Sequence, residues 1–260
     1  RPIKKVPSLT GKHCVNMFYE NSTRTRISFE LAQKRLSADV TNFSASTSSV
    51  KKGESLKDTI QNLDAMKLDC VVMRHPSPGS CLSLTSYVDA VIINAGDGIH
   101  EHPSQGLLDL LSLHSQFKGK LKNKNIAIVG DILHSRVARS NIFGLITLGA
   151  NVMVCGPPNL IPVNIKNLGV EVSYDIQSTL EWADAINVLR IQKERMGRGL
   201  IASDREYKNF FGITADRMNS LKKELVILHP GPINRGVEID SEVADSEQSI
   251  ILDQVLNGVA

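Results

Sequence analysis

Five consecutive residues, Ser22-Thr23-Arg24-Thr25-Arg26, combine three hydroxyl groups with two guanidinium groups. They follow an apolar run that predicts a strand and precede a stretch, 27–32, that predicts a helix. A helix that starts here directs unpaired backbone N–H groups and the positive end of its dipole outward. Hydroxyls and arginine forks bind phosphate oxygens well. Ser22 alone could be an ordinary helix N-cap with solvated arginines nearby, but the five residues together predict an anion site.

Other polar side chains in the first half also follow predicted strands. Arg74 follows the run 70–73, and His102 and Gln105 follow the run 90–94. Pro103 suits the first position of a helix, which puts Gln105 in the first turn. A lone histidine is more often structural, yet the nearby arginine and the hydroxyl-rich segment favour a functional role for His102.

The second half repeats this arrangement. Arg136 lies in the first turn of a predicted helix, where a cation is disfavoured unless an anionic ligand binds. Arg190 and Gln192 leave a strand end two residues apart and can point the same way. The segment His229-Pro230-Gly231-Pro232 follows the last strand. Its prolines lack N–H donors, so it predicts either a rigid turn or backbone carbonyls that accept from a ligand amide.

The loop 44–54 consists mostly of small, polar and basic residues, and it contains Ser48 and Lys52. It is either a flexible linker or an extended functional loop that binds anions. Five cationic side chains are thus candidates to face one cleft: Arg24, Arg74, Arg136, Arg190 and Lys52. The sequence contains no carboxylate pair, metal cluster or Ser-His-Asp arrangement. It therefore predicts a site for several anionic groups that works by positioning and electrostatics, without a metal or a cofactor.

Composition excludes several other classes. A net charge of +3 with scattered basic residues argues against nucleic acid, and the absence of an apolar run of 18 residues argues against a membrane span. Of the dinucleotide motif only Gly130 is present, and the strand ending at Cys155 lacks the acid that binds a ribose, so NAD is not expected. Four cysteines without metal-ligand spacing predict free thiols in a reducing cytoplasm.

Nine strands and six helices are predicted to position these residues. The strands are 13–19, 40–43, 70–73, 90–94, 125–130, 151–155, 170–174, 185–189 and 225–228, and the helices are 23–36, 55–66, 103–117, 135–148, 180–183 and 214–221. Short apolar strands alternating with helices predict parallel sheets covered on both faces. A polar, Lys-rich stretch at 117–124 predicts a domain boundary.

The expected fold is therefore α/β, with two doubly wound parallel-sheet domains at 1–119 and 120–260. A C-terminal helix near 247–260 is expected to return to the first domain. Ligands of such folds bind at the carboxyl ends of strands, so the cleft between the domains is the expected active site.

These residues together resemble the aspartate/ornithine carbamoyltransferase family over nearly the whole chain. The resemblance rests on four motifs: S-T-R-T-R at 22–26, H-P-x-Q at 102–105, R-x-Q with K-E-R at 190–195, and H-P-x-P at 229–232. Ornithine enzymes differ in the last motif and lack the loop at 48–54, so the resemblance implies aspartate as the acceptor. Position 231 is Gly where some members carry Leu, but only its backbone carbonyl is required.

The resemblance implies transfer of the carbamoyl group of carbamoyl phosphate to the amino group of L-aspartate, an early step of pyrimidine biosynthesis. The implied phosphate ligands are Ser22, Thr23, Arg24, Thr25 and Arg74, and the implied catalytic residues are Thr25, Arg74, His102 and Lys52. Gln105 and the carbonyls of Pro230 and Gly231 are implied to hold the carbamoyl NH₂, and Arg136, Arg190, Gln192, Gly231, Pro232 and Lys52 to bind aspartate. Ser48 and Lys52 are implied to reach the site of a neighbouring subunit in a homotrimer.

The sequence leaves alternative functions open. The runner-up function is that of a carbamoyltransferase acting on ornithine or a related amine. An NAD-dependent oxidoreductase and a non-catalytic anion-binding paralogue belong to different classes. The sequence gives no indication for or against a regulatory chain or a dihydroorotase as a further partner.

Overall fold

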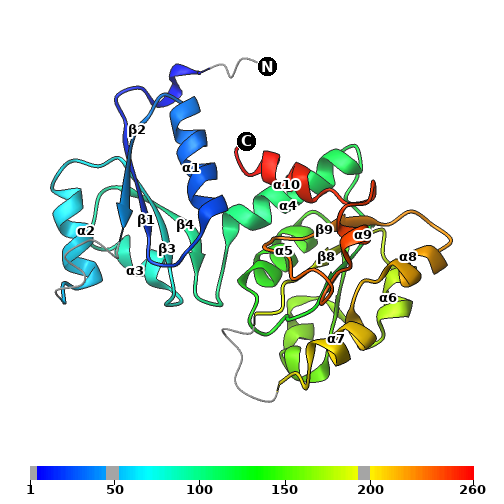
Figure 1. Ribbon diagram of the computed structural model, residues 1–260. Coiled ribbons are helices and arrows are strands. Elements are labelled where there is room, and N and C mark those ends of the chain that lie inside the picture. Colours follow the sequence, from blue (N-terminus) through cyan, green and yellow to red (C-terminus); the bar gives the residue numbers. More distant parts are fainter. Residues whose placement is uncertain (1–4, 45–52, 193–199) are drawn as a thin grey trace. The chain divides into compact units, whose positions relative to one another are not determined.

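The computed structural model describes residues 5–44, 53–192 and 200–260 (Figure 1). The chain forms two compact units, Arg1–Ser104 with Gly258–Ala260, and Gln105–Asn257. The division falls in the first turn of helix α4 (Pro103–Gln116). The polar stretch 117–124 follows the same helix, so the position of the boundary depends on the unit to which α4 is assigned.

The first unit contains a parallel sheet in the order β2-β1-β3-β4. Its strands are β1 (His13–Phe18), β2 (Asp39–Ser44), β3 (Cys70–His75) and β4 (Val91–Asp97). Its helices are α1 (Thr23–Arg35), α2 (Leu56–Asp64) and α3 (Ser80–Leu84), preceded by a 3₁₀ turn at Pro7–Leu9.

Both faces of this sheet are covered. Val71 and Met73 of β3 pack with Ile60 of α2 on one face. Val72 lies on the other face in a cluster against which Phe29 of α1 packs. Because successive residues of a strand point to opposite faces, burial of both faces explains the continuous apolar runs in the sequence.

The second unit contains a parallel sheet in the order β7-β6-β5-β8-β9. Its strands are β5 (Asn125–Val129), β6 (Asn151–Cys155), β7 (Glu171–Ser173), β8 (Ala185–Val188) and β9 (Val226–Leu228). Besides α4, its helices are α5 (Arg136–Thr147), α6 (Ile176–Trp182), α7 (Asp204–Phe211), α8 (Ala215–Ser220), α9 (Ser241–Ala244) and α10 (Ile251–Asn257), with 3₁₀ turns at Pro158–Leu160 and Ile165–Leu168.

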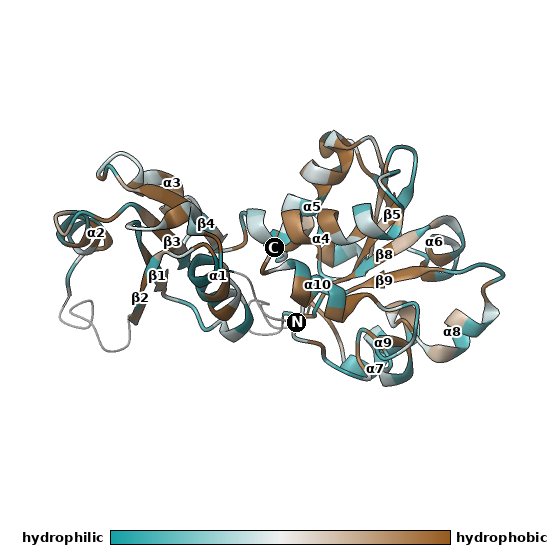
Figure 2. Ribbon diagram, turned by 90° about the horizontal axis from the view of Figure 1, so that it is seen from above, coloured by the Kyte–Doolittle hydropathy of each residue, from teal (hydrophilic) through white to brown (hydrophobic). Residues whose placement is uncertain are grey.

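The central strand β5 shows how this unit is built. Ile126 and Ile128 face a cluster that includes Leu113 of α4 and Ile142 of α5. Ala127 and Val129 face the opposite cluster, which includes residues of α6, α9 and α10. Figure 2 shows β8 and β9 in the brown of apolar residues, as expected for strands between two layers of helices.

The predicted fold class is confirmed, and all nine predicted strands are present with ends shifted by a few residues. The six predicted helices are also present, although α6 begins at Ile176 rather than at Leu180. Helices α3, α7 and α9 were not predicted. The predicted C-terminal helix is α10; it belongs to the second unit, and only residues 258–260 group with the first. Within the described ranges, no helix is both long and apolar enough to cross a bilayer.

Candidate functional site

Both sheets contain a point where the order of strands reverses. In the first sheet this point lies between β1 and β3, and in the second it lies between β5 and β8. Ligands of doubly wound folds bind outside the carboxyl ends of the strands at such points. The segment 22–26 follows β1, and Arg74 lies near the end of β3; Arg136 follows β5, and Arg190 follows β8. The topology of each unit therefore gathers the predicted site residues at its own switch point.

The start of α1 lacks a side-chain cap that five other helices have. Ser22 is the N-cap, but its side chain makes no capping hydrogen bond. Five other helices have a side-chain cap: Ser55, Ser135, Asp175, Ser203 and Thr214 each accept from a first-turn N–H. The first N–H groups of a helix have no helical acceptor. The N-terminus of α1 therefore presents hydroxyl and N–H groups that can donate to an anion.

Arg74 is the centre of the first group of site residues. Its Nη1 lies 3.4 Å from Thr25 Oγ1, to which it donates, and 3.5 Å from His102 Nε2. Its Nε donates to Glu20 Oε2 at 3.2 Å, and the arginine side chain is only 15% exposed. The pairing between β3 and β4 is irregular between Met73 and His75, on either side of Arg74. Irregular pairing of this kind commonly redirects a side chain beside an active site.

A guanidinium only donates hydrogen bonds, so Nε2 of His102 is the acceptor in its contact with Arg74. The other ring nitrogen, Nδ1, lies 3.3 Å from Ser104 Oγ. His102 is buried, with 5% of its surface exposed. The predicted grouping of Thr25, Arg74 and His102 is thus present in the first unit, where polar groups from the ends of three strands, β1, β3 and β4, converge.

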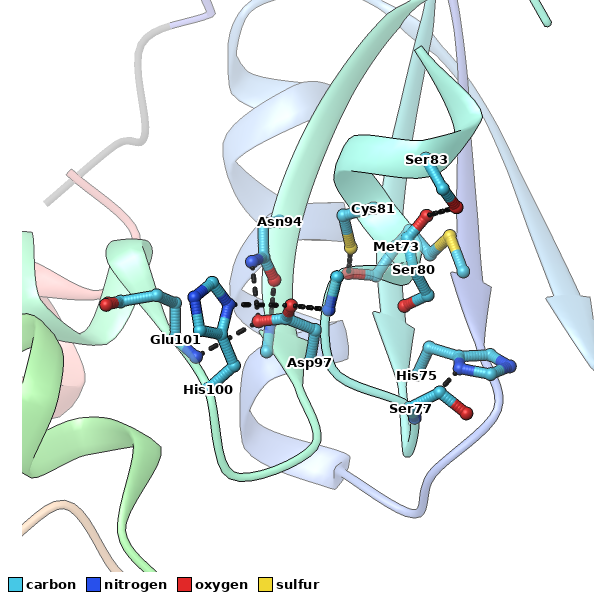
Figure 3. Close-up of polar contacts among 12 residues, drawn as sticks. Met73, His75, Ser77, Ser80, Cys81, Ser83, Asn94, Asp97, His100 and Glu101 are labelled. Carbon is cyan, nitrogen blue, oxygen red and sulfur yellow. Dashed lines mark hydrogen bonds and ion pairs between the residues drawn. The ribbon is translucent and has the colours of Figure 1, made fainter. Parts of the chain in front are cut away.

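The buried carboxylate of Asp97 holds the loop that leads to His102 (Figure 3). It accepts from the backbone N–H groups of Gly79 and Glu101 at 2.7 and 3.1 Å, and from the amide of Asn94 at 2.9 Å. His100 Nδ1 lies 3.1 Å from the same carboxylate. Burial alone would raise the pKa of Asp97, but these hydrogen bonds outweigh it and lower the pKa.

A second support holds α1 against the sheet. Asn16 of β1 is fully buried and exchanges two side-chain hydrogen bonds of 3.0 Å with Gln33 of α1. Asn16 also donates to Asn42 of β2 at 3.1 Å. A buried amide must find partners, so this pair fixes the position of α1 on the sheet, and with it the segment 22–26.

In the second unit, Arg136 is the first residue of α5 and is only 3% exposed. The preceding Ser135 caps the helix by accepting from the N–H of Ala138 at 3.1 Å. A cation in the first turn of a helix opposes the helix dipole, and an anion beside it lowers this cost.

The residues after β8 are held by groups from two other loops. Gln192 Nε2 donates to the backbone carbonyl of His134 at 3.2 Å, and Asn234 Nδ2 donates to that of Ile191 at 3.3 Å. His134 in turn lies 2.8 Å from the fully buried carboxylate of Asp131. Burial raises the pKa of Asp131, although the hydrogen bond with His134 opposes this. The half-buried Arg190 and Gln192 are therefore set on a braced segment.

The turn at 229–232 is built on a buried histidine. The backbone N–H of Gly231 donates to His229 Nδ1 at 2.8 Å, so Nε2 carries the proton and donates to Glu238 Oε1 at 3.2 Å. Glu238 Oε1 also accepts from the backbone N–H of Asn234 at 2.6 Å. The turn is thus fixed from inside, with Pro230 buried and Pro232 exposed.

The side-chain amide of Gln105 contacts a buried carboxylate. Its Nε2 donates to Asp109 Oδ1 at 2.8 Å, and Asp109 is fully buried. Burial raises the pKa of Asp109, and the hydrogen bonds it accepts act in the opposite direction.

Ser48, Lys52 and the K-E-R segment 193–195 lie outside the described residues. Several supporting residues were not predicted from the sequence, namely Asn16, Glu20, Asp97, Asp109, Asp131, His134 and Glu238. Asp97 and Asp131 each follow a glycine at a strand end, a signal that could have drawn attention to them. All four cysteines are free thiols, and the described residues contain no group of three or more His, Cys, Asp or Glu side chains placed to hold a metal ion.

Comparison with known proteins gives matches over the whole chain. Residues 1–115 match the family model described as aspartate/ornithine carbamoyltransferase, carbamoyl-P binding domain. Residues 122–260 match the model described as aspartate/ornithine carbamoyltransferase, Asp/Orn binding domain. The first match contains the α1 N-terminus, Arg74 and His102, and the second contains Arg136, Arg190 and the turn at 229–232.

Individual relatives agree with these models. The chain is 61% identical to the aspartate carbamoyltransferase catalytic subunit of Christiangramia forsetii and 58% identical to that of Gemmatimonas aurantiaca, over all of this chain and 84% and 81% of those proteins. Among solved structures, aspartate transcarbamoylase from Trypanosoma cruzi in complex with carbamoyl phosphate and aspartate matches with a TM-score of 0.86 at 30% identity. That match covers 98% of this chain and 83% of the other.

Proposed function

This chain belongs to the aspartate/ornithine carbamoyltransferase family, and we propose that it transfers the carbamoyl group of carbamoyl phosphate to the amino group of L-aspartate, giving N-carbamoyl-L-aspartate and phosphate. The observation that carries the proposal is the meeting of Thr25, Arg74 and His102 beside an uncapped helix N-terminus. This arrangement offers donors both to a phosphate and to a neighbouring carbonyl oxygen.

The phosphate of carbamoyl phosphate is held, in this proposal, at the start of α1. Ser22, Thr23 and Thr25 supply hydroxyl and N–H donors, while Arg24 and Arg74 supply charge. The absence of a side-chain cap at Ser22 supports this role, because an anion would accept from the N–H groups that a cap normally satisfies.

The chemical step is attack of the deprotonated aspartate amine on the carbamoyl carbon, followed by departure of phosphate. Negative charge grows on the carbonyl oxygen in the transition state. Thr25, Arg74 and His102 are the donors that we assign to this oxygen, which is stabilisation by preorganised hydrogen bonds without a covalent enzyme intermediate. For His102 this role requires a proton on Nε2, so its contact with Arg74 is exchanged for one with the ligand. Gln105 and the carbonyls of Pro230 and Gly231 accept from the carbamoyl NH₂.

Aspartate carries two carboxylates, and the second unit provides two arginines for them. We assign Arg136, Arg190 and Gln192 to the carboxylates, because guanidinium forks match carboxylate geometry. Gly231 and Pro232 complete this part of the site. The bracing of 190–192 by His134 and Asn234 supports the assignment, since a segment that is fixed before binding loses less freedom when the ligand binds.

We further propose a homotrimer in which Ser48 and Lys52 act in the site of a neighbouring subunit. The resemblance of the loop 48–54 to the family pattern supports this arrangement. We also propose a cytoplasmic enzyme, supported by its four free thiols, because cytoplasmic proteins keep their cysteines reduced.

The direct test is a colorimetric assay for carbamoyl-aspartate made from carbamoyl phosphate and L-aspartate. Product is expected with aspartate and not with ornithine under the same conditions. Product with ornithine alone would favour the runner-up acceptor. Binding of carbamoyl phosphate without any product from either amine would favour a non-catalytic paralogue.

A further inference from the structure

Asp109 lies at the centre of a buried cluster of side-chain amides. Its Oδ1 accepts from Gln105 Nε2 at 2.8 Å and from Gln254 Nε2 at 2.6 Å. Its Oδ2 accepts from Asn141 Nδ2 at 2.7 Å and from Asn187 Nδ2 at 3.1 Å. The carboxylate has no exposed surface. All four of these contacts come from amides, on α4, α5, β8 and α10.

A side-chain amide has an NH₂ group that donates hydrogen bonds and an oxygen that accepts them. When the NH₂ group donates to a carboxylate, which only accepts, the amide oxygen must point elsewhere. Gln105 therefore gives its NH₂ to Asp109 and keeps its Oε1 as the atom that it can offer to a ligand. We propose that Asp109 is a positioning residue that fixes the orientation of the Gln105 amide, so that this part of the site accepts from a ligand NH₂ and disfavours an acyl phosphate without one. This inference rests on the proposed function, in which Gln105 meets the carbamoyl NH₂.

The same carboxylate also acts on the turn at 229–232 through Gln254. The amide of Gln254 donates from Nε2 to Asp109, and its Oε1 accepts from the backbone N–H of His229 at 2.9 Å. One buried carboxylate thus orients two amides. Gln105 presents the acceptor on its own side chain. Gln254 anchors the turn in which the carbonyls of Pro230 and Gly231 are further acceptors.

The local packing shows that the cluster is held closely. A Cβ on Gly106 would lie 3.1 Å from Ser140 Cβ, so α4 and α5 approach each other one turn from the Asp109–Asn141 contact. The remaining amide oxygens of Asn141 and Asn187 are buried without a partner in the described structure. These two residues forgo a hydrogen bond to keep their NH₂ groups on Asp109, which indicates that the carboxylate sets the direction of the amides.

The test is Asp109→Leu, assayed with carbamoyl phosphate as substrate and acetyl phosphate as competitor, since acetyl phosphate has a methyl group in place of the NH₂. The leucine removes the acceptor that holds the Gln105 amide, so this amide is free to turn its NH₂ toward the ligand. A mismatch of donors at a buried site weakens binding about 5- to 150-fold. We expect KM for carbamoyl phosphate to rise about 10-fold or more, while the inhibition constants of acetyl phosphate and inorganic phosphate change less than about 3-fold.

Asn141→Leu is the matched control. It removes a donor from the same carboxylate but leaves the Gln105–Asp109 contact, so it should lower the melting temperature without changing the selectivity for carbamoyl over acetyl phosphate. A purely structural role of Asp109 predicts instead that Asp109→Leu weakens the three ligands equally. That result, or a folded Asp109→Leu with wild-type selectivity, overturns the inference.

If Asp109→Leu does not fold, Gln105→Met decides. It removes the oxygen that Asp109 is proposed to direct toward the ligand, so the same loss of selectivity is expected; wild-type selectivity would overturn the inference. The wild-type protein separates this inference from the proposed function. If it makes no carbamoyl-aspartate, the proposed function fails, whereas product formation together with an unselective role of Asp109 contradicts only the inference.

Discussion

Arg74 is the residue on which the proposed chemistry depends most. It is mostly buried, it contacts Thr25 and His102, and its Nε is held by Glu20. The ion pair with Glu20 orients the guanidinium, so that Nη1 is directed toward the two other side chains. Glu20 was not singled out in the sequence because a single acidic residue after a strand has no distinctive pattern.

Arg74→Ala should reduce kcat by about 10²- to 10³-fold, the usual effect of removing one donor to a developing oxyanion. The fold should be retained, as judged by circular dichroism and thermal unfolding. Arg205→Ala, on the exposed side of α7, is the matched control and should leave kcat unchanged. A folded Arg74→Ala enzyme with near-normal kcat would remove Arg74 from the mechanism.

Asp97 makes an acid-dependent contribution to stability. Its pKa is lowered in the folded state, so its contribution is complete above the ordinary aspartate pKa of about 3.9 and is lost as the pH falls through the lower folded value. Asp97→Asn should therefore lower the free energy of unfolding by about 1.5–3 kcal/mol at pH 7, with a smaller difference from wild type near pH 3. Urea unfolding at both pH values measures this.

Asp175→Asn is the control for the Asp97 variant. Asp175 is an exposed helix N-cap, a position where asparagine serves as well as aspartate, so the change should have little effect on stability. A loss for Asp97→Asn that stays constant from pH 7 to pH 3 would contradict the assigned role of its charge.

At the scale of elements, the loop between β4 and α4 determines where His102 lies. Gly98 has a φ of +57°, and a Cβ there would lie 2.6 Å from the backbone oxygen of Pro76 and 2.7 Å from Pro78 Cδ. Only glycine allows this loop to pass so close to the segment before α3. The shape of the loop therefore depends on one residue type.

Gly98→Ala should destabilise the protein by more than the roughly 1–2 kcal/mol expected for a left-handed backbone alone, because it adds a clash with backbone. It should also lower kcat by displacing His102. Gly11→Ala is the matched control, since Gly11 has a φ of +76° and open space around its Cβ position. Thermal unfolding and kcat are measured for both variants. The difference between them gives the effect of the clash beyond that of the left-handed backbone. Equal losses of stability would contradict the importance of the close approach.

The elements themselves were largely predictable, and the reason is physical. Strands buried on both faces appear as short apolar runs, so all nine were found. Helix α7 was missed because its charged sequence lacks a long apolar stripe, although Ser203 and Glu206 stand at the spacing of a capping box. Helices α3 and α9 are too short for a periodic pattern to emerge.

The residues predicted to touch ligand came from motifs at strand ends, and Thr25, Arg74 and His102 do lie together. Their supports were not predictable in the same way. Asp109 stands among leucines in α4, where its local pattern resembles that of a solvated helix face. Its partners Asn141, Asn187 and Gln254 lie 32, 78 and 145 residues away, so no local window of sequence connects them.

At the scale of the whole molecule, the proposed homotrimer places residues of two chains in one site. Lys52 is assigned to the site of a neighbouring subunit, whereas Arg24 is assigned to the site of its own chain. Inactivating these two residues in different chains therefore leaves some sites of a mixed trimer with both residues intact.

Mixing inactive Lys52→Ala and Arg24→Ala chains, with dissociation and reassembly, should restore part of the wild-type activity. Each variant taken alone through the same procedure should remain inactive. Sedimentation establishes that trimers have formed. Mixed trimers without any activity would contradict a site shared between subunits.

The position of Gln254 has a consequence for the synthesis of the protein. The amide that joins Asp109 to the turn at 229–232 comes from α10, 145 residues later in the chain. A nascent chain that has already folded its two sheets still lacks this amide until residue 254 leaves the ribosome. The anchor of the turn therefore forms only after both sheets have been synthesised, and a ribosome that stalls before α10 produces a chain with both sheets but without this anchor.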